Sequence, residues 1–445
     1  MAYTLTDQQG KAVRSIVNWF KHETEAQQAF VLGGFAGTGK STILPSIVDG
    51  LGISLGQIAF MAPTGKAAKV MGDKLRQMGI VTVCTTVHSA IYTPKPQKAE
   101  MLEKDLEQAH KDYSDIEAGN IAPPTGDKKS SLDELARKIK IIQKDLDRAY
   151  DLNDLRFQLN KEGKLVQEDI RLIILDEGSM VGEEMAGDLL DFEIPVLVMG
   201  DPGQLPPVGD NPGFFNRTPD AFLTEVHRQA QDNPIIYIAT QVRKGLRCDF
   251  GDYDGLAKII RPKEDVYTYD LSRDAQILCG THKRRFIITS KLRRSAGYRS
   301  NAPQEGEPLI MCKNSKEFPN LVNGMQCFAA RDHDDLEDGS ARFLLELIDE
   351  EDKRRRLFAV QSYFEAHEKR DKDFYTASKQ ANFKAKIKDH HVDFGWAITC
   401  HKSQGSQWDE VIVHDESHVF REASDQWLYT AVTRAAERLI IIAPE

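Results

Sequence analysis

The segment from Gly34 to Ser41 restricts the fold of this chain more than any other feature. Its sequence, Gly-Phe-Ala-Gly-Thr-Gly-Lys-Ser, satisfies the pattern G-x-x-x-x-G-K-[ST] at every fixed position. A buried strand is predicted before it, at residues 30–32, and an apolar candidate helix begins at Ser41. Strand, glycine-rich loop and helix in this order indicate a phosphate-binding loop in an α/β domain, rather than a glycine-rich turn with a chance lysine.

The residue types in this loop indicate how it holds phosphate. Glycines let the backbone aim N–H groups at phosphate oxygens, the Lys40 ammonium adds positive charge, and the Ser41 hydroxyl is a ligand for Mg²⁺. The predicted nucleotide contacts in and beside the loop are Gly34, Ala36, Gly37, Thr38, Gly39, Lys40, Ser41 and Thr42.

An acidic pair directly follows a second predicted strand. Residues 172–175 are all apolar, and Asp176 and Glu177 come next. A strand that is apolar on both faces is typical of a parallel sheet covered by helices. In a chain with a phosphate loop, this pair indicates an Mg²⁺ ligand in Asp176 and a group that polarises the attacking water in Glu177. A solvated acidic loop is the alternative.

A third apolar strand is predicted at residues 196–199, and Gln204 lies in the proline-rich segment that follows it. The carboxyl ends of parallel strands are where α/β sheets bind ligands. The Gln204 amide is therefore a candidate to contact a γ-phosphate or to orient water. Without the other motifs, this segment would be read as a proline-rich loop only.

Together these segments resemble superfamily 1 helicases over most of the chain and in the order that the family has. Beside the phosphate loop, the ranges that are similar to family motifs are 5–9 (the glutamine motif), 62–68 (Ia), 85–89 (a strand-contacting motif), 176–180 (II), 200–208 (III), 223–228 (IV), 394–406 (V) and 429–435 (VI). The ranges 204–208 and 401–405 resemble the RecD and Dda group, superfamily 1B. That resemblance implies an ATP-dependent DNA helicase moving 5′→3′ on single-stranded DNA.

The resemblance also implies roles for single residues. ATP and Mg²⁺ are the implied cofactors, with Gln9 at the adenine, Gly405 among the ATP contacts, and Ser41 and Asp176 at the metal. Arg228 and Arg434 are implied to act as arginine fingers. The catalytic set is then Lys40, Asp176, Glu177, Gln204, Arg228 and Arg434. The residues implied to contact DNA are Pro63, Thr64, Thr86, His88, Thr281, Thr399, His401 and Lys402.

Composition divides the chain into two predicted motor domains with two insertions. We predict two RecA-like α/β domains, 1A (1–90 and 165–232) and 2A (233–325 and 392–445). Residues 91–164 are charged, with leucines and isoleucines at helical spacing, which predicts a helical hairpin, domain 1B. Residues 326–391 contain alternating segments around a charged turn, which predicts a small β-barrel. Similar enzymes carry an SH3-like domain 2B there, whereas their 1B insertion is often a short β-type pin.

Charge and cysteine usage are consistent with this interpretation. The chain has 445 residues, a formal net charge of −10, 41% hydrophobic and 28% charged residues. The charge argues against coating nucleic acid by bulk attraction, although the basic runs 283–285 and 291–294 are candidate local contacts. Six cysteines without metal-ligand spacing, no membrane-length apolar run and no signal-peptide pattern predict a cytoplasmic protein of a bacterium or a phage-infected host.

The expected partners are single-stranded DNA and junctions of single- and double-stranded DNA, with a single-strand-binding or replication protein as a further candidate. A monomer without membrane contact is expected, in DNA replication, repair or recombination. Two alternatives stay open. One is a single-stranded nucleic-acid translocase or RNA-directed helicase with the same ATPase. The other is a phosphate-loop ATPase that remodels proteins, which would need neither motif Ia nor motif V.

Overall fold

The structure is a computed structural model, and it describes residues 5–94, 98–124, 126–149, 157–161, 163–225, 232–262, 275–315, 317–335, 342–369 and 389–444. Arg228, one of the two implied arginine fingers, lies outside these ranges.

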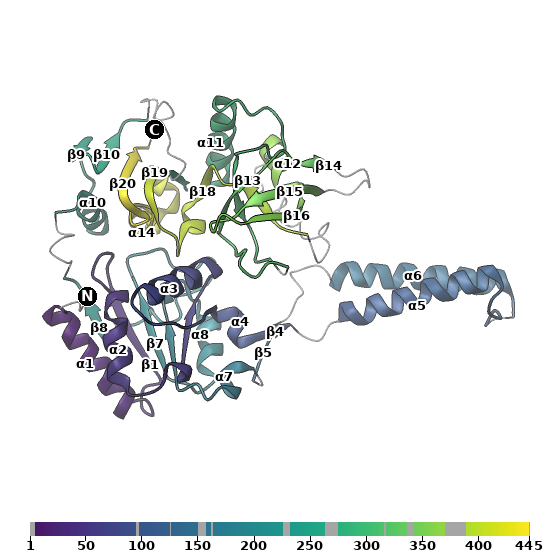
Figure 1. The fold of residues 1–445 in the computed structure, drawn as a ribbon, viewed down its shortest axis with the longest axis horizontal. Helices are drawn as coiled ribbons and strands as arrows, with labels where there is room; N and C mark the ends of the chain where they lie inside the picture. The colour runs from purple at the N-terminus through teal and green to yellow at the C-terminus, as the bar shows by residue number, and fades with distance from the viewer. Residues whose placement is uncertain are drawn as a thin grey trace.

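The N-terminal part of the chain forms a six-stranded parallel sheet in the order β3-β2-β6-β7-β1-β8 (Figure 1, lower half). Alternate residues of β6 pack into different cores: Ile174 faces the side covered by α1 and α2, and Ile173 faces the side covered by α4 and α8. Burial on both faces explains why β6 is apolar throughout.

The elements of this first sheet and its helices agree with the strands predicted at 30–32, 172–175 and 196–199. The strands are β1 (Ala29–Gly34), β2 (Ile58–Ala62), β3 (Cys84–Thr86), β6 (Leu172–Leu175), β7 (Val196–Gly200) and β8 (Ala221–Leu223). The helices are α1 (Asp7–His22), α2 (Leu44–Leu51), α3 (Gly65–Gln77), α4 (Val87–Ile91), α7 (Lys164–Gln167) and α8 (Glu183–Leu190), with 3₁₀ turns η1 (Ser41–Ile43), η2 (Leu55–Gln57) and η3 (Gly178–Met180).

The C-terminal part contains a second six-stranded sheet, in the order β18-β11-β19-β20-β10-β9, in which only the β9–β10 pair is antiparallel. Its strand β19 is also buried on both faces: Val411 packs with α10 and α14, and Ile412 packs on the side of α11. The strands are β9 (Gly251–Tyr253), β10 (Ala257–Ile260), β11 (Ala275–Cys279), β18 (Ala397–Thr399), β19 (Trp408–His414) and β20 (Ala435–Ile442). The helices are α10 (Pro234–Arg243), α11 (His282–Ser295) and α14 (Ser424–Val432), with η5 (Cys400–Ser403) and η6 (Ser417–Ala423).

A third sheet is antiparallel and lies beside the second (Figure 1, upper right). The predicted hairpin around the charged turn is β15 paired with β16. The sheet extends beyond the predicted insertion 326–391, because β12 pairs with both β13 and β17 and lies between them. Its elements are β12 (Pro308–Met311), β13 (Gln326–Ala329), β14 (Asp334–Asp335), β15 (Arg342–Ile348), β16 (Arg354–Val360), β17 (Val392–Phe394) and α12 (Ser362–Lys369).

Two long helices, α5 (Lys98–Ala118) and α6 (Lys128–Ala149), lie side by side and project from the body of the molecule (Figure 1). Ala109, Ile116 and Ile142 are buried between them. Within the range 91–164 predicted to be a helical hairpin, residues 157–159 form a strand instead, β5 (Phe157–Leu159). This strand pairs antiparallel with β4 (Tyr92–Pro94).

These elements confirm the predicted α/β fold with two RecA-like, parallel-sheet domains. Among the described residues, no helix combines the length and the apolar character that crossing a bilayer requires.

Candidate active site

The phosphate loop connects the carboxyl end of β1 to η1 and α2. Gly37 and Gly39 have φ angles of 77° and 79°, in the left-handed region that glycine enters without steric cost. The Lys40 ammonium lies inside the loop, where Nζ donates to the carbonyl oxygens of Gly34 at 2.5 Å and Phe35 at 3.2 Å. These carbonyls hold the lysine in the position from which it would turn to a nucleotide phosphate.

Gln9 supports the same loop from α1. Its Nε2 donates to the Thr38 carbonyl at 3.0 Å, and its Oε1 accepts from the Thr6 N–H at 3.1 Å as part of a capping box. Gln9 is buried. The structure therefore places the predicted adenine contact directly beside the phosphate loop.

Asp176 and Glu177 follow β6, two strands from β1, with β7 between them. Burial, reinforced by the negative charge of Glu177, raises the pKa of Asp176 to about 6. Asp176 Oδ1 accepts from the Glu177 N–H at 3.0 Å, and Glu177 has a φ angle of 53°. A left-handed backbone at a residue other than glycine is strained and is concentrated at functional sites.

The acidic pair suits Mg²⁺ only in combination with nucleotide. Among the described residues, no group of three histidine, cysteine, aspartate or glutamate side chains could hold a metal by itself. Mg²⁺ is usually bound by one or two protein oxygens together with substrate phosphates. The partly buried Asp176 carboxylate and the Ser41 hydroxyl at the loop are such ligands, so the residues present fit the ion.

Gln204 follows β7 and is buried. Within the described structure its Oε1 atom has no hydrogen-bond partner. A buried amide oxygen without a partner is unfavourable by about 1–3 kcal/mol. A water molecule could donate to it, which is compatible with the orientation of water, one of the two roles predicted for this side chain.

Two residues of the second sheet's helices contact the phosphate loop, and sequence reasoning assigned neither of them a role. Tyr429 on α14 accepts from the Ala36 N–H at 2.9 Å and donates to buried Asp201 at 2.7 Å. The guanidinium of Arg243 on α10 lies 3.5 Å from the centroid of the Phe35 ring. Tyr429 lies in motif VI, five residues before Arg434. Its position in that motif is the sequence signal that could have indicated a role for it.

The Arg434 guanidinium makes hydrogen bonds to residues of its own domain. Its Nε donates to the Thr430 carbonyl at 3.0 Å, and Nη1 donates to the Ser406 carbonyl at 3.2 Å. Nη2 donates to the Thr433 hydroxyl at 3.1 Å. Arg434 is buried near the contact between α14 and motif III, where Thr430, one turn earlier, accepts from the Leu205 N–H at 2.8 Å.

Gly405 lies against motif Ia. A Cβ atom added to it would come within 2.7 Å of the Ala67 Cβ and 3.4 Å of the Thr64 hydroxyl. Its φ angle of 74° also requires glycine. The structure thus places Gly405 beside a predicted DNA contact, Thr64, and no described contact joins it to the phosphate loop.

Three predicted DNA contacts share one structural position. Thr64, Thr86 and Thr281 each follow a strand and cap the N-terminus of a helix, where the hydroxyl accepts a backbone N–H at 3.1–3.2 Å. Helix N-termini attract phosphate because their first N–H groups are free to donate. At Thr281 the Glu416 carboxylate already lies at this position and accepts from the Gly280 and Thr281 N–H groups at 2.8 and 3.0 Å.

The other predicted DNA contacts are Pro63, His88, Thr399, His401 and Lys402. Burial lowers the pKa of His88 and of His401, so both rings are neutral at pH 7. Thr399 is buried at the end of β18, and Pro63 is partly buried after β2. Lys402 donates to Cys312 Sγ at 3.2 Å.

Asp176→Asn is expected to stabilise the fold while abolishing activity. The folded pKa of about 6 lies above the ordinary value of 3.8, so ionised Asp176 destabilises the folded state at neutral pH, by up to about 3 kcal/mol at 1.36 kcal/mol per pKa unit. The gain in unfolding free energy should be full above pH 6 and vanish below about pH 4. Thermal unfolding of both proteins, followed as a function of pH, measures this gain. If Asp176→Asn were less stable than wild type at pH 7, the raised pKa of Asp176 would be rejected.

Two family models match the chain. Residues 4–255, more than half of the chain, match the model described as an AAA domain, and residues 394–442 match that of a UvrD-like helicase C-terminal domain. An uncharacterized protein of Methanocaldococcus jannaschii is 22% identical over 93% of this chain and 36% of the relative. An ATP-dependent RecD2 DNA helicase of Deinococcus radiodurans is 25% identical over 92% of this chain and 46% of the relative.

The chain thus spans less than half the length of these two relatives. It is also similar to a solved structure of two coordinating Pif1 helicases at forked double-stranded DNA, with 16% identity, coverage of 100% of this chain and 95% of the other, and a TM-score of 0.50. That likeness concerns the fold. Because residues 4–255 match its model, the chain belongs to the AAA domain family.

Proposed function

We propose that this protein is an ATP-dependent DNA helicase that moves 5′→3′ along single-stranded DNA and separates the strands of a duplex. The observation that carries the proposal is the contact of α14 with two nucleotide-site elements. Tyr429 bonds both the phosphate loop at Ala36 and motif III at Asp201. A change at the loop on ATP binding or hydrolysis would therefore reach the second sheet directly.

ATP would bind at the phosphate loop, with Lys40 at the β- and γ-phosphates and Gln9 near the adenine. Mg²⁺, held by Ser41 and Asp176, would neutralise phosphate charge. Glu177 would then polarise the attacking water, and the free Gln204 carbonyl would orient it. Arg434 and Arg228 would supply positive charge from the other side of the cleft.

Single-stranded DNA would lie across the helix N-termini capped by Thr64, Thr86 and Thr281. Hydroxyl and backbone N–H groups bind phosphates without fixing a sequence, as a translocating protein requires. At Thr281, DNA would have to displace the Glu416 carboxylate. The contact of Gly405 with Ala67 brings motif V of one sheet next to motif Ia of the other, so closure of the cleft would change the spacing between two strand contacts.

A strand-displacement assay tests the activity and its direction. A duplex with a 5′ single-stranded tail should be unwound in the presence of Mg²⁺ and ATP, and a duplex with only a 3′ tail should not. Unwinding from the 3′ tail would reject the proposed 5′→3′ direction, but it would not reject the helicase activity. RNA substrates of the same design separate the RNA-directed alternative, and ATP hydrolysis that no nucleic acid stimulates would favour a protein-remodelling ATPase.

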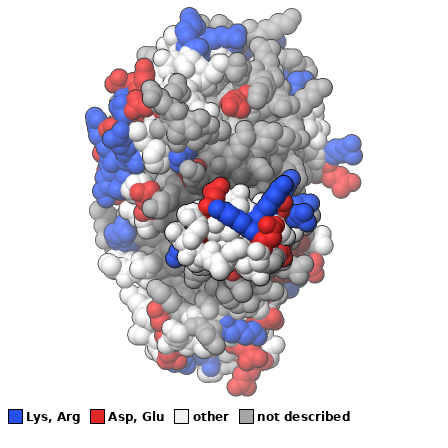
Figure 2. All heavy atoms as spheres, turned by 90° about the vertical axis from the view of Figure 1, so that its right-hand side faces the viewer, with Lys and Arg blue, Asp and Glu red and all other residues white. Residues whose placement is uncertain are grey.

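Deletion of the helical hairpin is expected to separate unwinding from ATP hydrolysis. We propose that α5 and α6, domain 1B, support strand separation. The end of the hairpin, which points at the viewer in Figure 2, carries charges of both signs, including Asp127, Lys128 and Lys129, and is not a purely basic surface.

Joining residue 94 to residue 157 through a short glycine linker should keep DNA-stimulated ATPase activity and lose most unwinding, measured on the same 5′-tailed duplex. The reason is that every proposed ATP contact lies outside the hairpin. Full unwinding by the deletion variant would assign the hairpin to another role, such as binding a partner protein.

A further inference from the structure

A cavity of about 240 Å³ lies where α11 meets α12, and none of the phosphate-loop residues or of the eight residues implied to contact DNA lines it. Arg293, Arg294 and Arg299 line it together with hydroxyl, amide and imidazole groups. None of the described residues that line it is an aspartate or a glutamate. From the sequence, the run 291–294, which contains Arg293 and Arg294, was a candidate local contact with nucleic acid, and no cavity was predicted there.

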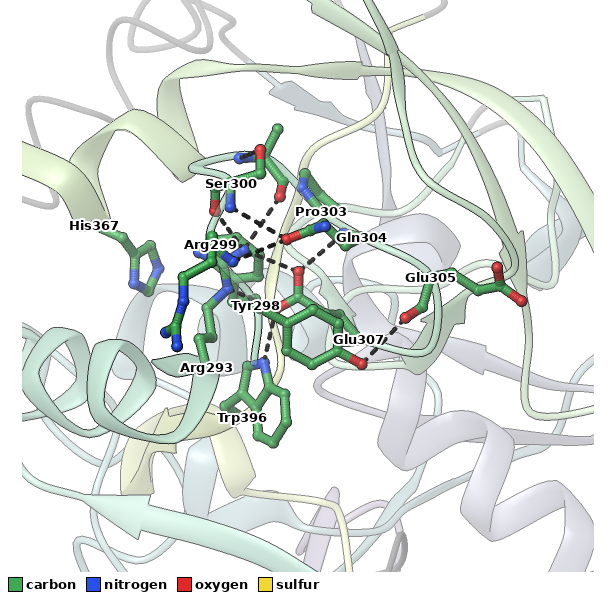
Figure 3. Close-up of polar contacts among 12 residues, drawn as sticks. Arg293, Tyr298, Arg299, Ser300, Pro303, Gln304, Glu305, Glu307, His367 and Trp396 are labelled. Atoms are coloured by element: carbon green, nitrogen blue, oxygen red, sulfur yellow. Dashed lines mark hydrogen bonds and ion pairs between the residues drawn. The ribbon is translucent and has the colours of Figure 1, made fainter. Parts of the chain in front are cut away.

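Arg293 forms the fixed wall of the cavity. Its Nε and Nη2 donate to the buried Glu307 carboxylate at 2.5 and 2.9 Å, and Glu307 also accepts from Trp396 Nε1 at 3.2 Å (Figure 3). Nη2 further donates to the Ser300 carbonyl at 2.7 Å. The charge of Arg293 is therefore balanced inside the protein, and this arginine holds the neighbouring loop in place.

Arg294 and Arg299 are different, because both are exposed and neither makes an ion pair with any described carboxylate. The loop that carries Arg299 is pinned: the Arg299 and Ser300 N–H groups both donate to Gln304 Oε1 at 3.1 Å (Figure 3). Arg299 Nη1 also donates to the Arg294 carbonyl at 3.1 Å. Two guanidinium groups without an ion-pair partner among the described residues thus line a preformed cavity.

Thr289 and His367, two residues that line the cavity, each have a buried polar atom without a partner in the described structure, Oγ1 and Nδ1 respectively. Thr289 is fully buried, and His367 is 6% exposed. His367 Nε2 lies 2.8 Å from the Asp393 carboxylate, which can only accept, so Nε2 carries the proton and Nδ1 of the neutral ring accepts. Each such group is unfavourable by about 1–3 kcal/mol unless a ligand or a water satisfies it.

We propose that this cavity is a second phosphate-binding site and that the phosphate belongs to the backbone of a nucleic-acid strand. Guanidinium groups bind phosphate oxygens in pairs, the Thr289 hydroxyl can donate to a third oxygen, and His367 Nδ1 can accept from a water or hydroxyl beside the group. A volume of about 240 Å³ is below the roughly 300–1,000 Å³ of pockets for drug-sized ligands, so a single phosphate suits it better than a whole nucleotide.

The inference that the phosphate belongs to a nucleic-acid strand rests on the proposed function. The inference that the cavity binds phosphate does not. Inorganic phosphate is therefore the first probe, with chloride at the same ionic strength as the reference. Phosphate should raise the unfolding temperature of the wild type and of Arg76→Ala, an exposed control arginine on α3, by the same amount. The rise should be smaller for Arg299→Ala and for Thr289→Val.

The phosphate loop contributes equally to all four proteins, so the difference between them isolates the cavity. Thr289→Val keeps the shape of the side chain and removes only a hydroxyl without a described partner, so it should fold as well as wild type. Equal phosphate shifts in all four proteins would overturn the site.

The second measurement tests whether the phosphate in the cavity belongs to a nucleic-acid strand. Binding of a single-stranded oligonucleotide is followed against salt concentration, where each lost phosphate contact lowers the slope of log K against log salt by about 0.7. The Arg294→Ala, Arg299→Ala double variant should lose about one contact, and Arg76→Ala should lose none. An unchanged slope with a reduced phosphate shift would assign the cavity to free phosphate. If wild type bound no DNA, the proposed function would fail, and the phosphate shift would still decide the cavity.

Discussion

Glu177→Gln is expected to bind ATP normally and to lower its turnover by about 10²–10⁴-fold, which is the usual contribution of a general base. The substitution keeps the size of the side chain and removes only its ability to accept a proton. The left-handed backbone at Glu177 does not depend on the charge, so the loop after β6 should keep its shape. ATP binding measured by titration and steady-state hydrolysis in the presence of DNA give the two quantities.

Glu184→Gln is the matched control, because Glu184 is exposed on α8 close to the same sheet and makes no proposed nucleotide contact. It should leave binding and turnover unchanged. If Glu177→Gln hydrolysed ATP at a near-normal rate, another group would have to activate the water, and the role of Glu177 would be rejected.

Arg434→Ala should reduce kcat by about 10³–10⁵-fold with a much smaller change in KM, the range known for arginine fingers. A finger acts on charge that develops in the transition state, so its loss appears mainly in kcat. In the structure the guanidinium is bonded to Thr430, Ser406 and Thr433 of its own domain. The arginine would therefore exchange these acceptors for phosphate oxygens when the cleft closes.

Two comparisons separate this role from a structural one. Arg438→Ala removes an exposed arginine of β20 that pairs with Glu410, and it should leave kcat unchanged. Arg434→Lys keeps the charge and should recover only part of the rate, because a lysine lacks the planar donor pair. If Arg434→Ala raised KM alone, Arg434 would be a substrate-binding residue. A large fall in unfolding temperature would indicate that its present hydrogen bonds matter for folding.

Local patterns in the sequence were sufficient for the nucleotide side of the site. The apolar strand before Gly34 and the one before Asp176 are continuous in sequence, and both strands end at the same edge of one parallel sheet. Gly37 and Gly39, the two phosphate-loop glycines with positive φ, lie inside the motif from which the loop was predicted. Residue types that are constrained by a short segment can be recognised without knowledge of the fold.

Contacts between distant segments could not be predicted in this way. Tyr429 and Ala36 are 393 positions apart, and neither strand periodicity nor charge pattern connects them. The same holds for the pairing of Leu309 with Phe394, which enlarges the antiparallel sheet beyond its predicted range. Arg285, in a basic run considered for DNA contact, is instead buried against Asp393 at 2.6 Å. A run of like charges does not show which member faces inward.

The base of the helical hairpin has a mechanical consequence. The hairpin leaves and re-enters the first domain at β4 and β5, a ribbon of two three-residue strands. A helix of 22 residues is about 33 Å long at 1.5 Å per residue, so a rotation of about 10° at the ribbon would move the far end by about 6 Å. The hairpin is thus a lever arm, in which a small rotation at the base gives a displacement of several ångströms at the far end.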